Sequence, residues 1–193
     1  MQADYTIELG SEDPTLTVPW ESPDGGLRYR DLRQYPDFLL YIEEAIRYPE
    51  LGEFLARING ERSLLQSAKC DVWFTAELNE EELIYGAAGK FGGYIDLFFS
   101  DSSTRSDFPA NEELARRLVA LLVRAPELPS SAELIIRRGY FDWEGHSESG
   151  YYFTCYVFGY GDEEAEARRH WTVSLKLVEN ALLQLVARKA ESL

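Results

Sequence analysis

Cysteine and basic residues are scarce in this sequence of 193 residues. The first scarcity argues against a disulfide, and the second argues against nucleic-acid and membrane partners. The two cysteines, Cys70 and Cys155, occupy strand-like positions where we expect them to face inward, which favours reduced, buried thiols over a disulfide. Lys and Arg number 19 against 34 Asp and Glu, giving a formal net charge of −15. Because this charge repels nucleic-acid phosphates and anionic lipid surfaces, we expect no nucleic-acid partner and no membrane partner.

Long apolar segments are lacking as well. No run approaches the ~20 apolar residues that a membrane-spanning helix needs. Residues 1–5 have neither the basic start nor the apolar stretch of a signal peptide, so we predict a cytoplasmic location. Hydrophobic residues at 45% and charged residues at 27% are globular values. We predict one soluble domain over residues 1–193, with an N-terminal arm at 1–34 and an α+β core at 35–193.

The sequence also contains no clear signature of catalysis, metal binding or nucleotide binding. The glycine-rich stretch 86–93 superficially resembles a phosphate-binding loop, but Lys90 is followed by Phe91 instead of Ser or Thr, and predicted strands flank it. A β-bulge or bend formed by its glycines is the preferred interpretation. The sequence therefore predicts no catalytic residue, no metal site and no cofactor.

Apolar and polar residues alternate most clearly between residues 70 and 100, as in a β-hairpin. We predict one strand at 64–78 and further strand at 83–87 and 91–100. Each half has an apolar face, made of Cys70, Val72, Phe74, Ala76 and Leu78 and of Phe91, Ile95, Leu97 and Phe99. A second hairpin is predicted from strands at 132–143 and 151–160, joined by the polar loop 144–150.

Helical spacing of apolar residues predicts three helical regions. A bent pair of helices covers 36–59, because Pro36 and Pro49 each suit the first turn of a helix. A second region covers 111–124. The third is a long helix at 163–190, whose buried stripe consists of Trp171, Leu175, Val178, Leu182 and Leu185.

The order of these elements indicates the fold class. We predict an α+β fold, in which an antiparallel β-sheet of about five strands carries the helices on one face and the N-terminal arm adds short strands. The succession helix, three strands, helix, two strands, helix is similar to that of secretion-chaperone-like domains, which are commonly acidic. This resemblance in element order implies a chaperone-like binding protein.

The other face of the predicted sheet is too aromatic to remain in water. Its six aromatic residues represent an area on the order of 1,000 Å², more than a monomer usually leaves exposed in one patch. They are Trp73, Tyr94, Phe98, Tyr152, Tyr156 and Phe158. The N-terminal arm, a second copy of the chain, or a ligand or partner could cover this face, and the arm is favoured because it is always close by.

The aromatic face directs the functional prediction. We expect a non-enzymatic binding or protein-interaction domain, with a homodimer forming if the arm covers only part of the face. The alternative is a small-ligand-binding protein or a hydrolase, with a carboxylate site between the arm and the sheet. Its pocket would be lined by Trp73, Tyr94, Tyr152 and Tyr156, with Asp96 or Glu77 as the polar group.

Overall fold

Six strands form one sheet in the computed structural model, which describes residues 1–143 and 145–190. The order of the strands is β1-β5-β6-β4-β3, and β2 also pairs with β5. Their bounds are Gln2–Glu8 (β1), Leu16–Val18 (β2), Leu65–Thr75 (β3), Gly89–Phe99 (β4), Ser130–Trp143 (β5) and His146–Gly161 (β6). Strands from both predicted hairpins therefore meet at the centre, where β4 pairs with β6.

The prediction of an α+β fold is confirmed, but the prediction of a purely antiparallel sheet is wrong. The pairs β3–β4, β4–β6 and β6–β5 are antiparallel, whereas β1 and β2 each run parallel to β5. Both parallel strands come from the arm. The long chain between the arm and β5 supplies the crossover that parallel pairing requires, and the arm thereby pairs with an edge of β5.

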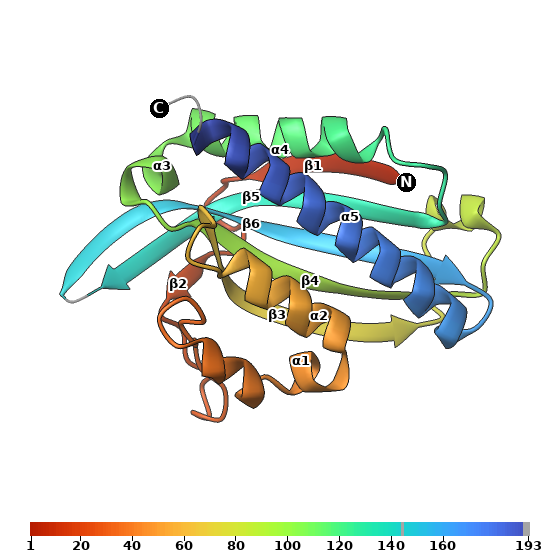
Figure 1. Ribbon diagram of the computed structural model, residues 1–193, viewed down its shortest axis with the longest axis horizontal. Helices are drawn as coiled ribbons and strands as arrows, with labels where there is room; N and C mark the ends of the chain where they lie inside the picture. The colour runs from red at the N-terminus through yellow and green to blue at the C-terminus, as the bar shows by residue number, and fades with distance from the viewer. Residues whose placement is uncertain (144, 191–193) are drawn as a thin grey trace.

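Three helices cover one face of the sheet (Figure 1). The helical segments are η1 Pro36–Tyr41, α1 Glu43–Arg47, α2 Pro49–Ile58, η2 Glu82–Tyr85, α3 Ser102–Ser106, α4 Phe108–Leu122 and α5 Glu164–Ala190. Helix α5 crosses the middle of the sheet, with α2 and α4 on either side of it. None of the helices within the described residues is long and apolar enough to span a lipid bilayer.

The main core lies between these helices and the apolar face of the sheet. The whole predicted stripe of α5 is buried, and the Trp171 ring lies 5.1 Å from the ring of Phe91 on β4, measured between centroids. Cys70 and Cys155 face this core as free thiols, and burial raises the pKa of each to about 12. The thiols are therefore protonated and unreactive at neutral pH.

Two predicted local features differ in the structure. The segment 83–87 is not a strand, because Asn79 and Glu82 each accept a hydrogen bond from the other's backbone N–H and so start the helical turn η2. The order is thus helix, two strands, helix, two strands, helix. The hairpin loop predicted at 144–150 is also shorter, since β6 begins at His146; residue 144 lies outside the described residues.

The glycines of β4 do not form the predicted bulge. The pairing of β4 with β6 is regular from Gly89 to Leu97, and the irregularity of the sheet lies in β3, between Ser67 and Lys69. A Cβ atom on Gly92 would lie 2.1 Å from the ring of Phe158. The glycine therefore makes room for an aromatic ring on the neighbouring strand.

A second, smaller core lies on the face without the long helices. It is formed by Phe98, Phe141 and Tyr152 from the sheet, together with Leu16 and Val18 of β2. The arm then crosses to the far edge of the sheet, where the indole Nε1 of Trp20 donates a 2.8 Å hydrogen bond to the carbonyl of Ala68 on β3. One end of this face is therefore covered by the arm.

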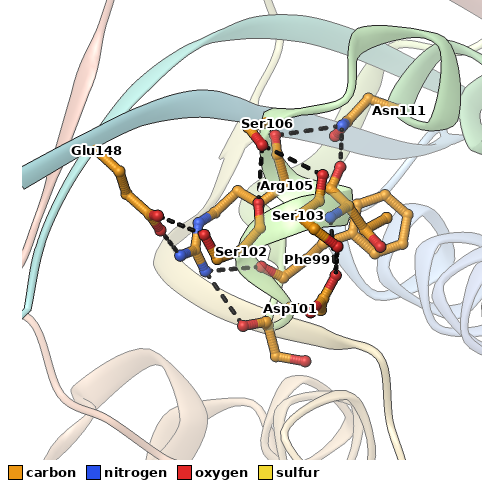
Figure 2. A network of polar contacts seen from close by, with 10 residues as sticks. Phe99, Asp101, Ser102, Ser103, Arg105, Ser106, Asn111 and Glu148 are labelled. Atoms are coloured by element: carbon orange, nitrogen blue, oxygen red, sulfur yellow. Dashed lines mark hydrogen bonds and ion pairs between the residues drawn. The ribbon is translucent and has the colours of Figure 1, made fainter.

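A buried arginine closes this covered end (Figure 2). Arg105 of α3 is 4% exposed, forms an ion pair with Glu148 of β6 and donates to the carbonyl of Phe99 at 3.0 Å. Its guanidinium carbon also lies 4.4 Å from the centroid of the Phe141 ring. In Figure 2, Glu148 lies on one side of Arg105 and Asn111 of α4 on the opposite side. The network ties α3 and α4 to the β5–β6 hairpin.

Candidate functional site

Four aromatic side chains beyond the covered end remain half-exposed; we call them the aromatic patch: Trp73, Tyr94, Tyr156 and Phe158. They come from β3, β4 and β6, and their rings contact one another. Phe158 lies 6.2 Å from Trp73 and 6.1 Å from Tyr156 between ring centroids, and Tyr94 lies 5.9 Å from Tyr156. The result is a continuous aromatic surface across three strands.

Strand register explains why these rings meet. Tyr156 is paired with Tyr94 in the register of β6 and β4, and Phe158 is paired with Gly92. Gly92 is in turn paired with Trp73 on β3. The Phe158 ring on β6 occupies the space above Gly92 on β4 and reaches the indole of Trp73 on β3. A side chain in place of Gly92 would block this contact, because it would fill the space between the two rings.

The sequence-predicted aromatic set is thus divided between two environments. Phe98 and Tyr152 are 0% and 3% exposed within the second core, whereas the four residues of the patch are half-exposed. The arm is therefore a partial cover. The prediction that these six residues share one face holds, but the patch alone is accessible for binding.

The predicted polar groups are also separated. Asp96 is 6% exposed, and Glu77 lies on the surface past the end of β3. Thr154 donates a 2.7 Å hydrogen bond to Asp96, and burial raises the pKa of Asp96 to about 6. Arg137 donates to Thr154 at 2.8 Å and to Glu8 at 2.8 Å. This polar chain links β4, β6, β5 and β1 between the patch and the second core.

A hollow of about 740 Å³ opens beside the patch, toward the N-terminal end of β1 and η2. Tyr156 and Phe158 belong to both the patch and the hollow. The full lining is Met1, Gln2, Ala3, Asp4, Asn79, Glu81, Glu82, Tyr85, Lys90, Val123, Ser131, Ala132, Glu133, Tyr156, Phe158 and Tyr160. Sequence reasoning did not identify this hollow, because its residues come from five separate segments.

A network of hydrogen bonds holds the wall of the hollow in place. Glu82 is 8% exposed and accepts from Lys90 at 2.6 Å and from the Tyr160 hydroxyl at 3.0 Å. Tyr85 stacks on Tyr160 with 4.0 Å between ring centroids. The only sequence signal for this network was Lys90 within its glycine-rich stretch, and the residue serves as the partner of Glu82 instead of a phosphate ligand.

Charges around the patch are unequally paired. Lys90 pairs with Glu82, Arg137 pairs with Glu8, and Lys69 lies 4.8 Å from the centroid of the Trp20 ring. Met1 also lines the hollow, and its N-terminal ammonium donates a hydrogen bond to the carbonyl of Pro126. Four exposed carboxylates form no ion pair among the described residues: Asp4, Asp71, Glu81 and Glu133. Of these, Glu133 lies near enough to the Arg137 guanidinium for that charge to act on its pKa. The surface that surrounds the aromatic rings is therefore acidic.

Glu133 shows how these carboxylates affect one another. It is paired with Tyr156 on β6 and with Asp4 on β1, so two carboxylates are adjacent on the same face. Partial burial and the nearby carboxylates of Asp4 and Glu8 raise the pKa of Glu133 by more than the charge of Arg137 lowers it. A cation placed here would relieve the repulsion.

A second hollow, of about 590 Å³, lies between the arm, α1 and the outer edge of β3. Its lining includes Trp20, Leu40 and Lys69, but not Trp73, Tyr94, Tyr152 or Tyr156. A hollow therefore lies between the arm and the sheet, but none of the residues predicted to line a pocket there contributes to it. Within residues 1–143 and 145–190, no three His, Cys, Asp or Glu side chains are grouped so that they could hold a metal ion.

Comparisons with protein-family models, with curated proteins and with solved structures found no match for this chain.

Proposed function

We propose that this chain is a non-enzymatic interaction protein that binds another polypeptide through the aromatic patch. The observation that carries the proposal is the patch itself, four contacting rings at the end of the sheet face that neither the helices nor the arm cover. Exposed aromatic clusters with polar surroundings are typical of protein-binding surfaces, where Trp and Tyr contribute much of the affinity. A chaperone-like activity would be one form of this function.

The second candidate is a small-ligand-binding protein, and the hollow of about 740 Å³ is the observation that favours it. A hydrolase is less well supported. Asp96 is buried and engaged by Thr154, while Glu77 lies at the surface beyond β3, so the two predicted carboxylates do not form a pair. A thermal-shift screen against metabolites tests the ligand alternative, because a bound ligand raises the melting temperature.

Peptide selection tests the main proposal. A library of random peptides is selected on the immobilised wild-type chain, and the enriched peptides are then measured against Tyr156→Ala and Tyr140→Ala. Tyr140 is a suitable control because it is an exposed tyrosine on the β5–β6 hairpin, outside the patch. We expect enriched peptides that lose affinity for Tyr156→Ala and keep it for Tyr140→Ala.

Two results would reject this function. Either no peptide is enriched, or the enriched peptides bind both variants equally. A strong thermal shift with one metabolite, combined with no enriched peptide, would establish the ligand alternative instead.

A further inference from the structure

The charges beside the patch indicate what kind of polypeptide would fit it. Lys90 and Arg137 are neutralised by Glu82 and Glu8, so these two side chains contribute little free positive charge to this face. The N-terminal ammonium of Met1, a residue on the lining of the hollow, donates to the Pro126 carbonyl and is outnumbered there by carboxylates. Asp71 borders the patch on β3 and Glu133 borders it on β5. Neither of these acids forms an ion pair among the described residues. The chain as a whole carries a charge of −15. Charge complementarity therefore favours a basic partner.

Aromatic rings add a second attraction for the same groups. The rings of Tyr156 and Phe158 are stacked at an interplanar angle of 10° and form one side of the hollow. The ammonium of Lys90 already lies 4.9 Å from the centroid of Phe158, so one face of this ring is in contact with a cation in the folded chain. A guanidinium or ammonium group is attracted to an aromatic face and to nearby carboxylates at the same time.

The hollow has the carboxylates needed for this arrangement. Asp4, Glu81 and Glu133 lie on its lining together with Tyr156 and Phe158. The carboxylates come from β1, from the loop before η2 and from β5, so they surround the opening from different elements. A long basic side chain could lie on the rings and place its charged end among the acids.

We propose that the aromatic patch binds a polypeptide segment bearing arginine or lysine, with one basic side chain entering the hollow between β1, η2 and β6. This inference rests on the proposed interaction function and names the chemical class of its partner. A second copy of the chain fits less well, because both copies bring the same unpaired acids to the contact.

The test uses a short fluorescein-labelled peptide of alternating arginine and leucine. Two control peptides replace every arginine with glutamine or with glutamate. Fluorescence anisotropy measures binding to the full-length chain at low and moderate salt. We expect the arginine peptide to bind, to weaken as salt rises, and to bind more tightly than both controls.

A matched pair of variants locates the binding. The double variant Asp71→Asn, Glu133→Gln removes two acids beside the patch, and the control Glu53→Gln, Glu61→Gln removes two exposed acids of α2 and the loop after it. Both change the net charge equally. We expect the first double variant to weaken binding about tenfold, because both of its acids would contact the peptide, and the second no more than about twofold, because its acids lie far from the patch. Circular dichroism and thermal melting check that each variant folds.

Each remaining outcome overturns the inference in a recognisable way. Equal weakening by the two double variants means that the peptide binds through the overall charge alone. Equal binding of the arginine and glutamine peptides, with loss in Tyr156→Ala, rejects the basic partner but leaves the interaction function intact. Displacement of the peptide by spermidine at matching affinity makes the hollow a site for free amines. No peptide binding, with a dimer in sedimentation, makes a second copy the occupant.

Discussion

The two ends of the open sheet face use the same strands and the same residue types, yet only one end is covered. Phe98 and Tyr152 are buried beneath the arm, while Tyr94 and Tyr156, on the same two strands β4 and β6, are half-exposed. The difference is set by the path of the arm, which crosses the sheet at Val18 and Trp20 and is fixed to β3 through Ala68. The number of aromatic residues on a sheet face therefore indicates that other residues must cover it, but it does not indicate how much of the face the arm covers.

Charge distinguishes the two ends as well. The covered end contains Arg105, whose guanidinium is buried and paired with Glu148. At the open end, Asp71 and Glu133 are exposed acids that form no ion pair among the described residues. A buried charge in a folded chain is normally paired, whereas exposed unpaired acids remain free to interact with another molecule.

The largest difference between the ends should appear in stability. Phe98→Ala removes a ring that is 0% exposed and leaves a cavity, which should lower the free energy of unfolding by about 4 kcal/mol. Tyr156→Ala, on the half-exposed patch, should lower it by about 1 kcal/mol. Urea denaturation of both variants measures this contrast. Equal losses would mean that the patch is covered as well as the second core.

Asp96, at the boundary between the ends, should make stability depend on pH. Its pKa rises on folding from 3.8 to about 6, so the folded chain binds the proton more tightly. The protonated carboxyl group of Asp96 therefore contributes stability that is fully present below pH 3.8 and is lost as pH rises through 6. The free energy of unfolding of the wild type, relative to Asp96→Asn, should fall by about 2 kcal/mol between pH 4 and pH 7.

Chemical denaturation of the two chains across this pH range provides the measurement, and the difference between them removes the effect of the other carboxylates. A constant difference would show that water reaches Asp96 from the open end. Such a result would place the boundary of the covered end closer to Tyr152.

The contrast between the ends also shows what sequence patterns can predict. The alternation in β4 and β6 and the stripe of α5 each depend on residues near in sequence, so the central hairpins, the helices and the aromatic face could be predicted. The parallel pairing of β1 could not, because seven residues of β1 pair with a strand that begins at Ser130. Such a contact leaves no periodic signal in either segment.

The candidate site was predictable in part for the same reason. Tyr94 and Tyr156 follow from alternation, but the position of the arm over Phe98 depends on tertiary contacts. The hollow is harder still. Lys90 on β4 pairs with Glu82 at the start of η2, and Glu133 on β5 lines the same hollow. No regular spacing along the sequence connects these three residues.

A smaller effect should follow from the bond that fixes the arm. Trp20→Phe keeps an aromatic ring but removes the donor to the Ala68 carbonyl, so the free energy of unfolding should fall by about 1 kcal/mol. Trp73→Phe is the matched change at the open end and should cost less than about 0.5 kcal/mol. Urea denaturation compares the two. If Trp20→Phe costs no more than Trp73→Phe, the arm is held mainly by Leu16 and Val18.

The smallest expected effect is self-association through the open end. The homodimer predicted from the sequence would bury the aromatic patch of each copy, the commonest closed arrangement of two identical surfaces. The charge of −15 on each copy opposes it, so we expect a weak dimer, visible only at high micromolar concentration and moderate salt. Tyr156→Glu, which adds a charge within the patch, should abolish it, and Tyr140→Glu should not.

Salt dependence separates this dimer from binding of a basic segment at the same patch. Screening beyond about 8 Å at physiological salt reduces the repulsion between two acidic copies, so their association should strengthen as salt rises. Screening also reduces the attraction between the acidic rim and a basic peptide, so that association should weaken. Sedimentation of the wild type and of Tyr156→Glu at low and moderate salt measures the first. A wild type that stays monomeric at both salts rules out the dimer, and the patch is then left to a different polypeptide.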